Sequence, residues 1–324
     1  MAVKTRIEWC DSTANYWRGC TEVSKEESGG GGCDNCYAES MNNWLHGGEN
    51  WGPGAPRHKY DTTSRIVRSW QRQASRFAQE HGRRRRIFVN STADTFDNEV
   101  EQAWREEIWD DIRACPDLLF MVLTKRIGNA RGMLPADWGC GYPNVMLLAT
   151  VVNQREVDRD VPKLLALPAR WRGISVEPQL GPIDLTRVNP ETAGWKERER
   201  YGDVLRGVML EQELVDNRRS AECPLDGKLD LVINGGESGR RARPSHPAWF
   251  RSLRDQCEEA GTAYLLKQIG EWVAREAVED TRADPPKSLV YVAKHDMTYR
   301  RVGKNAAGRA LDGREHIAFP KDFR

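Results

Sequence analysis

The sequence predicts an α/β fold in which a parallel sheet forms a partial or full (β/α) barrel. Short apolar runs alternate along the chain with longer amphipathic stretches, which is the pattern of strands connected by helices. The predicted strands are Ile87–Asn90, Leu118–Leu123, Val145–Thr150, Gly173–Val176, Leu229–Asn234 and Ala263–Leu266, with an earlier one near Tyr16–Gly19. The predicted helices are Ser64–Glu80, Glu99–Cys115, Gln154–Leu167 and Pro247–Ala260. Strands joined by helices pair in parallel, and these are too many for a small sandwich.

The chain has 324 residues, of which 39% are hydrophobic and 30% charged, so it can bury a sizeable core. We expect a barrel over residues 1–274, a charged insertion at 189–228 and a C-terminal extension at 275–324 that holds a small hairpin and a packing segment. No long apolar run and no secretory signal are present, so a cytoplasmic protein without a membrane partner is expected. The net charge of +1 argues against tight, unspecific binding to duplex nucleic acid.

Three of the eight cysteines are clustered, namely Cys20, Cys33 and Cys36, in a C-x12-C-x2-C pattern. Two thiolates at C-x2-C spacing can meet at one metal centre across a tight turn. Structural zinc takes four ligands, whereas a 4Fe-4S cluster held by three cysteines keeps one iron open for S-adenosylmethionine. Zinc closed by Cys10 or His46 remains an alternative, as does the absence of any metal.

The other cysteines are not expected to form disulfides in the cytoplasm. We expect Cys10 to be buried nearby without binding metal, and Cys115 and Cys257 to be small core residues. Cys140, in a GCGY loop, is a remote candidate for a hydrogen-atom donor, although an ordinary loop thiol fits it better.

Polar residues follow nearly every predicted strand, at the edge where the chemistry of parallel barrels is located. They are Ser91, Asp94, Lys125, Arg126, Asn153, Glu177, Glu237 and Lys267. Any one of them could instead be an ordinary loop residue or a helix N-cap. Arginine clusters at 83–86 and 240–243 and the abundant tryptophans would suit a nucleic acid, although an arginine run also suits the end of a helix.

Eight ordered segments of the chain resemble one family. They are IEWCDSTANYWRGCTEVS, CDNCYAE, FVNSTADTF, LTKR, SVEPQLGPIDL, GGESGRRARPSHPAWFRSLRDQC, LLKQIGEW and GKNAAGRALDG. They are similar to the three-cysteine-motif proteins of phages and bacteria, which are regarded as radical SAM-like, and the similarity spans Thr5 to Phe319. The resemblance implies a radical SAM barrel in which a reduced cluster cleaves S-adenosylmethionine and the 5′-deoxyadenosyl radical abstracts hydrogen from a substrate.

The sequence departs from the wider superfamily at three places. The first cysteine gap is twelve residues instead of three, with Lys25–Gly32 as the lengthening. Asn35 stands where an aromatic residue usually precedes the last cysteine, and Tyr37 follows instead. The Gly235–Gly236–Glu237 motif comes after about the sixth strand instead of the second, so its role is open.

The resemblance implies roles for most of the candidates. Cys20, Cys33 and Cys36 would bind the cluster, and Ser91 and Asp94 the methionyl amino group. Asn153, Glu177 and Tyr37 are the remaining candidates for binding the cofactor. Lys125, Arg126, Arg243 and Lys267 are expected to bind an anionic substrate.

The predicted function is therefore radical SAM chemistry on a substrate for which a nucleic acid base or nucleotide is favoured, in modification or DNA repair. A flavodoxin or ferredoxin would supply the electron. The alternative is a zinc-binding module that binds nucleic acid or another partner without radical chemistry.

Overall fold

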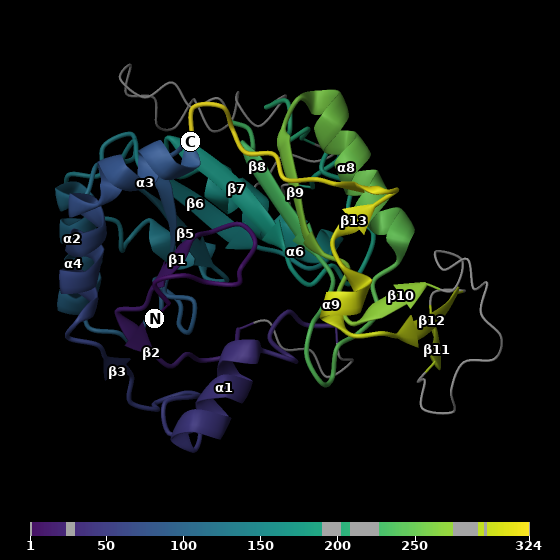
Figure 1. Cartoon of the computed structure of the whole chain (residues 1–324), viewed down its shortest axis with the longest axis horizontal. Helices are drawn as coiled ribbons and strands as arrows, with labels where there is room; N and C mark the ends of the chain where they lie inside the picture. Colours follow the sequence, from purple (N-terminus) through teal and green to yellow (C-terminus); the bar gives the residue numbers. More distant parts are fainter. Residues whose placement is uncertain are drawn as a thin grey trace.

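The computed structural model describes residues 2–23, 30–189, 202–207, 227–274, 291–294 and 297–323. Its centre is a curled, seven-stranded parallel sheet whose strands follow one another in space in chain order (Figure 1). The strands are β1 (Ser12–Ala14), β4 (Arg85–Val89), β5 (Leu118–Thr124), β6 (Val145–Thr150), β7 (Trp171–Val176), β8 (Leu231–Gly235) and β9 (Ala263–Gln268). In the part of the chain described, β1 and β9 are not paired with each other. The predicted α/β fold is confirmed, in its partial-barrel form.

The helices follow the amphipathic stretches of the sequence. They are α1 (Tyr37–His46), α2 (Thr63–Arg72), α3 (Ala74–His81), α4 (Gln102–Ala114), α5 (Ile127–Ala130), α6 (Gln154–Leu165), α8 (Pro247–Ala260) and α9 (Lys304–Ala307). The predicted helix at 64–80 is divided in two at Gln73, where the backbone leaves the helical conformation.

The first strand of the sheet was predicted at the wrong place. Ser12–Ala14 pairs with β4, whereas Trp17–Arg18 forms β2, which pairs with β3 (His58–Lys59) in a separate antiparallel ribbon. Ser12–Ala14 is buried but contains two polar residues, whereas Tyr16 and Trp17 are large aromatic residues, so the local pattern favoured the wrong segment. As a result, Cys20 follows the ribbon instead of ending a strand of the sheet.

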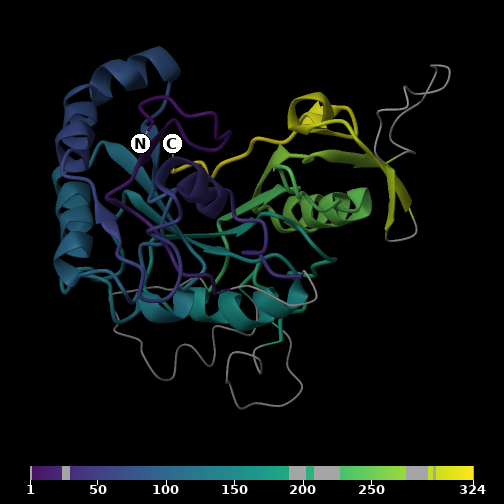
Figure 2. The ribbon, with the colours of Figure 1, turned by 90° about the horizontal axis from the view of Figure 1, so that it is seen from below.

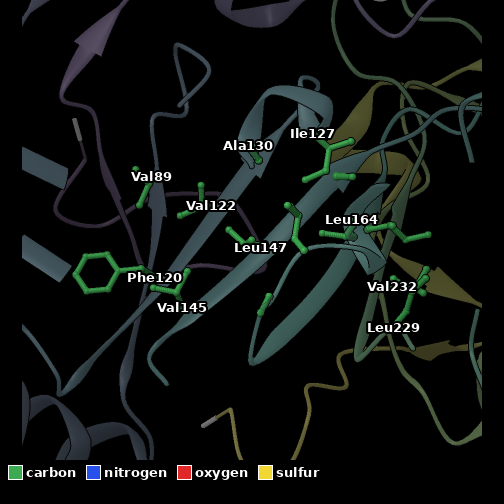
Figure 3. Close-up of a cluster of buried hydrophobic side chains, with 14 of the residues drawn as sticks. Val89, Phe120, Val122, Ile127, Ala130, Val145, Leu147, Leu164, Leu229 and Val232 are labelled. Carbon is green, nitrogen blue, oxygen red and sulfur yellow. The ribbon is translucent and has the colours of Figure 1, made fainter. Parts of the chain in front are cut away.

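The main core lies between the sheet and its helices. Val89, Phe120, Val122, Val145, Leu147 and Val232 point from the strands toward helical residues such as Leu164 (Figure 3). These strand residues alternate along each strand with residues of the other face, as a pleated strand requires. Each of these strands therefore contributes apolar side chains to both faces of the sheet, which explains its continuous apolar run.

The other face of the sheet carries a second core, built in part by the chain ends. Trp9 and Cys10 from the N-terminal segment and Phe319 and Phe323 from the C-terminal segment pack there against Phe88, Leu119, Met121, Met146, Leu148, Leu231, Ile233 and Leu265. In Figure 2 the two ends lie on the side of the sheet opposite α6. We call this the inner face.

The remaining strands form two small sheets. β12 (Met297–Arg301) lies between β10 (Trp272–Ala274) and β11 (Tyr291–Lys294), which confirms the hairpin expected in the tail. β13 (Ala310–Leu311) pairs with β14 (Arg314–Glu315). Most of the charged insertion, together with 24–29 between the clustered cysteines, lies outside the described residues, and the division into domains stays a prediction. Among the described helices, none has the length and apolar character needed to span a membrane.

Candidate functional site

The loop that carries Cys33 and Cys36 makes a tight turn before α1. The Cys36 N–H donates to the Cys33 carbonyl oxygen at 3.3 Å, and Cys33 is buried. Burial raises the pKa of the Cys36 thiol, and the neighbouring Cys33 raises that pKa further. The C-x2-C pair is therefore a local unit, as its spacing predicts.

Cys20 approaches the same edge of the sheet from the ribbon. Arg126 Nη2 lies 3.8 Å from Cys20 Sγ and donates to the Thr21 carbonyl oxygen at 2.6 Å. Burial raises the pKa of Cys20 to about 12, and Arg126 acts in the opposite direction. Lys125 lies near enough to Cys36 to lower the pKa of that thiol. Two consecutive cationic residues at the end of β5 therefore accompany two of the three clustered cysteines.

The side chains of the clustered cysteines are not gathered around one point in the described part of the chain. Over the described ranges, no three His, Cys, Asp or Glu side chains are gathered so as to hold a metal ion. All three cysteines are free thiols. Their chemistry, with cationic side chains beside them, suits an anionic iron–sulfur cluster, but their assignment as ligands stays a prediction.

Asp94 connects the loops after β4 and β5. Its carboxylate accepts hydrogen bonds from Thr124 Oγ1 at 2.7 Å, from the Phe96 N–H at 2.9 Å and from the Lys125 N–H at 2.9 Å. Burial raises the pKa of this carboxyl despite these bonds. Asp94 thus holds the loop of Lys125 in place, and its contact with a cofactor amino group stays a prediction.

Ser91 lies in the same loop as Asp94. Its Oγ donates to Asn15 Oδ1 at 3.1 Å. Its carbonyl oxygen accepts a hydrogen bond from the Tyr37 hydroxyl, which brings the start of α1 to the end of β4. Tyr37 is 56% exposed as a residue, yet burial of its hydroxyl raises the pKa of that group. The hydroxyl of Tyr37 is thus held at the end of β4, while much of the residue stays exposed.

Asn153 is the N-cap of α6. Its Oδ1 accepts the Glu156 N–H at 3.0 Å, a role typical of asparagine at this position. This contact accounts for the residue without a ligand, and a part in cofactor binding stays a prediction.

Glu177 and Lys267 form an ion pair, with Nζ and Oε1 2.9 Å apart. Ser175 donates to the other carboxylate oxygen at 3.0 Å. Burial alone would lower the pKa of Lys267, but Glu177 outweighs it and the pKa is raised. Lys267 was predicted to bind an anionic substrate, and in this structure its anionic partner is Glu177.

Arg243 belongs to a network that the sequence did not predict. It donates to Glu237 and to Asp34, a residue of the cysteine loop, at 2.7 and 3.1 Å. Asn35 of the same loop donates to Glu237 at 3.2 Å. The partners come from distant segments, and the only signal in the sequence was that Gly235–Gly236–Glu237 precedes an arginine cluster.

Two expectations outside the site need correction. Cys140 is disulfide-bonded, and it precedes β6 at the amino end of the sheet, so it cannot serve the carboxyl edge. In the arginine run, Arg83 pairs with Asp11 at 2.7 Å, and Arg86 lies 3.4 Å over the Phe319 ring. The run leads into β4, which begins at Arg85, and these two arginines contact the chain itself. Cys10, Cys115 and Cys257 are buried, as expected.

Comparisons with known proteins give a family and several distant structures. No curated protein sequence matches the chain. A spore photoproduct lyase mutant is similar at 12% identity and a TM-score of 0.39, over 94% of this chain and 72% of the other. A spore photoproduct lyase mutant with bound AdoMet and dinucleoside spore photoproduct is similar at 12% identity and a TM-score of 0.36, over 89% and 67% of the two chains.

The family comparison covers nearly the whole chain. A family model described as "Protein of unknown function (DUF5131)" matches residues 4–320. The match includes the clustered cysteines and all seven strands of the central sheet. The chain therefore belongs to the DUF5131 family.

Proposed function

We propose that this protein is a radical SAM enzyme whose cluster is bound by Cys20, Cys33 and Cys36. The observation that carries the proposal is at the end of β5, where Arg126 lies beside Cys20 and Lys125 near Cys36. Both cysteine loops thus reach the carboxyl end of one parallel strand, where such folds hold their active sites. Assembly of a cluster would draw the three sulfurs together.

The bound cluster and S-adenosylmethionine would supply a reactive radical, while the chain binds, orients and shields the reactants. Lys125 and Arg126 would balance the negative charge of the thiolates and sulfides, an effect that tunes cluster potentials. Tyr37, an exposed residue whose hydroxyl is held by Ser91, would stack on an adenine. Ser91 and Asp94 would contact the amino group, and Asn153 and Glu177 the ribose or carboxylate.

For the substrate we propose a nucleic acid base or a nucleotide. α1 begins directly after Cys36 and presents Trp44, which is 83% exposed, to the outside. Arg240 and Arg241 are exposed in the loop whose carbonyl at position 241 accepts a hydrogen bond from Asn35. Exposed aromatic side chains and exposed arginines suit the bases and phosphates of a single strand. A small electron-transfer protein such as a flavodoxin or ferredoxin would reduce the cluster.

Anaerobic purification tests the proposal against its main alternative, a zinc-binding module. We expect a brown protein with about four irons per chain, the content of one 4Fe-4S cluster, whose reduced form converts S-adenosylmethionine to 5′-deoxyadenosine. Cys33→Ala should lose the iron and keep the fold, and the matched Cys10→Ala should retain the iron. A colourless protein with one zinc per chain would refute the radical mechanism.

A further inference from the structure

We propose that the Glu237–Arg243 ion pair is the positioning element of the Cys33–Cys36 loop. Arg243 binds the Glu237 carboxylate in a bidentate pair through one edge of its guanidinium group, since Nη2 donates to Oε1 at 2.7 Å and Nε to Oε2 at 2.9 Å. The Arg243 backbone N–H adds a third bond to Oε2 at 2.7 Å. The two side chains are only 6% and 13% exposed, so the pair is a rigid, largely desolvated unit.

This unit holds both residues that separate the two cysteines. Arg243 Nη1 donates to Asp34 Oδ2 at 3.1 Å, and Glu237 Oε2 accepts a bond from Asn35 Nδ2 at 3.2 Å. Arg243 Nη2 also donates to the Gly31 carbonyl oxygen at 3.1 Å, just before Cys33. The turn that carries the two thiols is therefore attached on both sides of Cys33 to one ion pair.

Gly236, just before Glu237, explains why the Glu237–Arg243 ion pair is held rigidly. A Cβ on Gly236 would lie 1.9 Å from the Ile269 carbonyl oxygen, so only glycine lets the segments after β8 and β9 approach this closely. The Glu237 carbonyl oxygen accepts the Glu271 N–H at 3.0 Å. The position of Glu237 is thus fixed by backbone contacts that do not involve Arg243. A displacement of the ion pair would therefore be transmitted to the turn that carries Cys33 and Cys36.

The Gly-Gly-Glu motif therefore positions the thiols of the cysteine loop through the contacts of Glu237 and its partner Arg243 with Asn35 and Asp34. All of these contacts are made by residues of the chain itself, so positioning of the loop is a property of the chain. The consequence for metal binding rests on the proposed function.

The experiment is cysteine alkylation of the metal-free, full-length protein, with the rate at each cysteine followed by mass spectrometry of its peptide. Because Arg243→Met removes the link to Asp34 and Gly31, alkylation of Cys33 and Cys36 should accelerate by about tenfold or more through local opening. Cys20, which contacts Arg126 instead, should keep its rate, and so should Cys115 in the core. Glu237→Gln and Arg243→Lys, which preserve shape and part of the bonding, should give intermediate rates.

Controls separate positioning from stability and from metal binding. Arg251→Met removes an exposed ion pair with Asp312 at 2.9 Å and should leave all rates unchanged. Unchanged rates at Cys33 and Cys36 in Arg243→Met overturn the inference. If that variant also exposes Cys115, it has unfolded, and Glu237→Gln and Arg243→Lys decide instead, with wild-type rates in both overturning the inference. Accelerated alkylation in a protein that never binds iron would leave the positioning role intact and refute only the proposed function.

Discussion

Glu177 and Lys267 meet 2.9 Å apart over β8, because Glu177 directly follows β7, Lys267 belongs to β9, and Gly235 of the intervening β8 lies between them. A Cβ on Gly235 would come within 3.0 Å of Glu177 Oε1. The missing side chain thus leaves room for a charged pair on the inner face, near the carboxyl edge of the sheet.

Removing either member of this pair should destabilise the protein. The side chains are 13% and 21% exposed, so Glu177→Gln or Lys267→Met leaves a largely buried group unpaired, at a cost of about 3 kcal/mol. The double variant should cost less than the sum of the two, which denaturant unfolding of all four proteins would measure. Strictly additive losses would show that the two side chains do not interact.

The pH dependence of Glu177→Gln should have a defined sign. In the wild type Glu177 outweighs burial and holds the pKa of Lys267 above its usual value, so the pair stabilises the protein below that value and is lost at higher pH. In the variant burial, the largest influence, is opposed only by the smaller effects of Glu8 and Cys10, so we expect it to lower this pKa and the folded state to favour the neutral lysine. The deficit in melting temperature should therefore shrink between pH 7 and about 10, toward the usual lysine pKa. A deficit that is independent of pH would contradict this reading of Lys267.

Gly236 should tolerate no side chain. Because a Cβ would overlap the Ile269 carbonyl oxygen at 1.9 Å, Gly236→Ala must displace backbone, and a loss of about 3 kcal/mol is expected from such overpacking. Gly128→Ala, in α5, is the matched control. A Cβ on Gly128 would meet only the flexible Lys163 side chain, at 3.8 Å. Thermal unfolding should separate the two variants by several degrees, and equal midpoints would refute the close approach.

The Asp11–Arg83 ion pair should make the free energy of unfolding depend on pH in the acidic range. Burial raises the pKa of Asp11, but the hydrogen bonds from Arg83 and from the Arg86 N–H outweigh it and lower the pKa overall. The pair thus stabilises the protein above the usual aspartate pKa and loses this effect as the pH falls through the lower, folded value. Arg83→Met should cost up to about 1 kcal/mol at pH 7, as partly exposed pairs do, and progressively less toward pH 3. Thermal melts across this range test the convergence, and a constant difference would disprove it.

Trp44 should contribute to nucleic acid binding. If bases stack on its exposed ring, Trp44→Ala should weaken binding of a fluorescent single-stranded oligonucleotide by about 1–3 kcal/mol, the cost of one lost stacking contact. Ile317→Ala, which removes another exposed apolar side chain, should have no effect. Equal affinities of wild type and Trp44→Ala would exclude this helix from the substrate site.

The sequence by itself determined most of the α/β architecture. Six of the seven sheet strands and the main helices follow apolar runs and amphipathic stretches, because these patterns reflect local burial on a strand or a helix. The tight turn between Cys33 and Cys36 could also be predicted from the sequence, since two residues between two cysteines are typical of such a turn. The first strand was misplaced, because Ser12–Ala14 is buried but contains two polar residues, whereas the more hydrophobic Trp17 lies in the segment that pairs with β3 instead of β4.

Only the tertiary structure decided what the polar residues of the carboxyl edge contact. Asn153 caps a helix, Asp94 joins two loops and Lys267 meets Glu177, although each looked equally suited to bind a ligand. Arg243 reaches Asp34 across 209 residues of sequence. A pattern along the chain reports how each residue sits in its own strand or helix, whereas the partner of a charged side chain depends on which loops the folded sheet brings together.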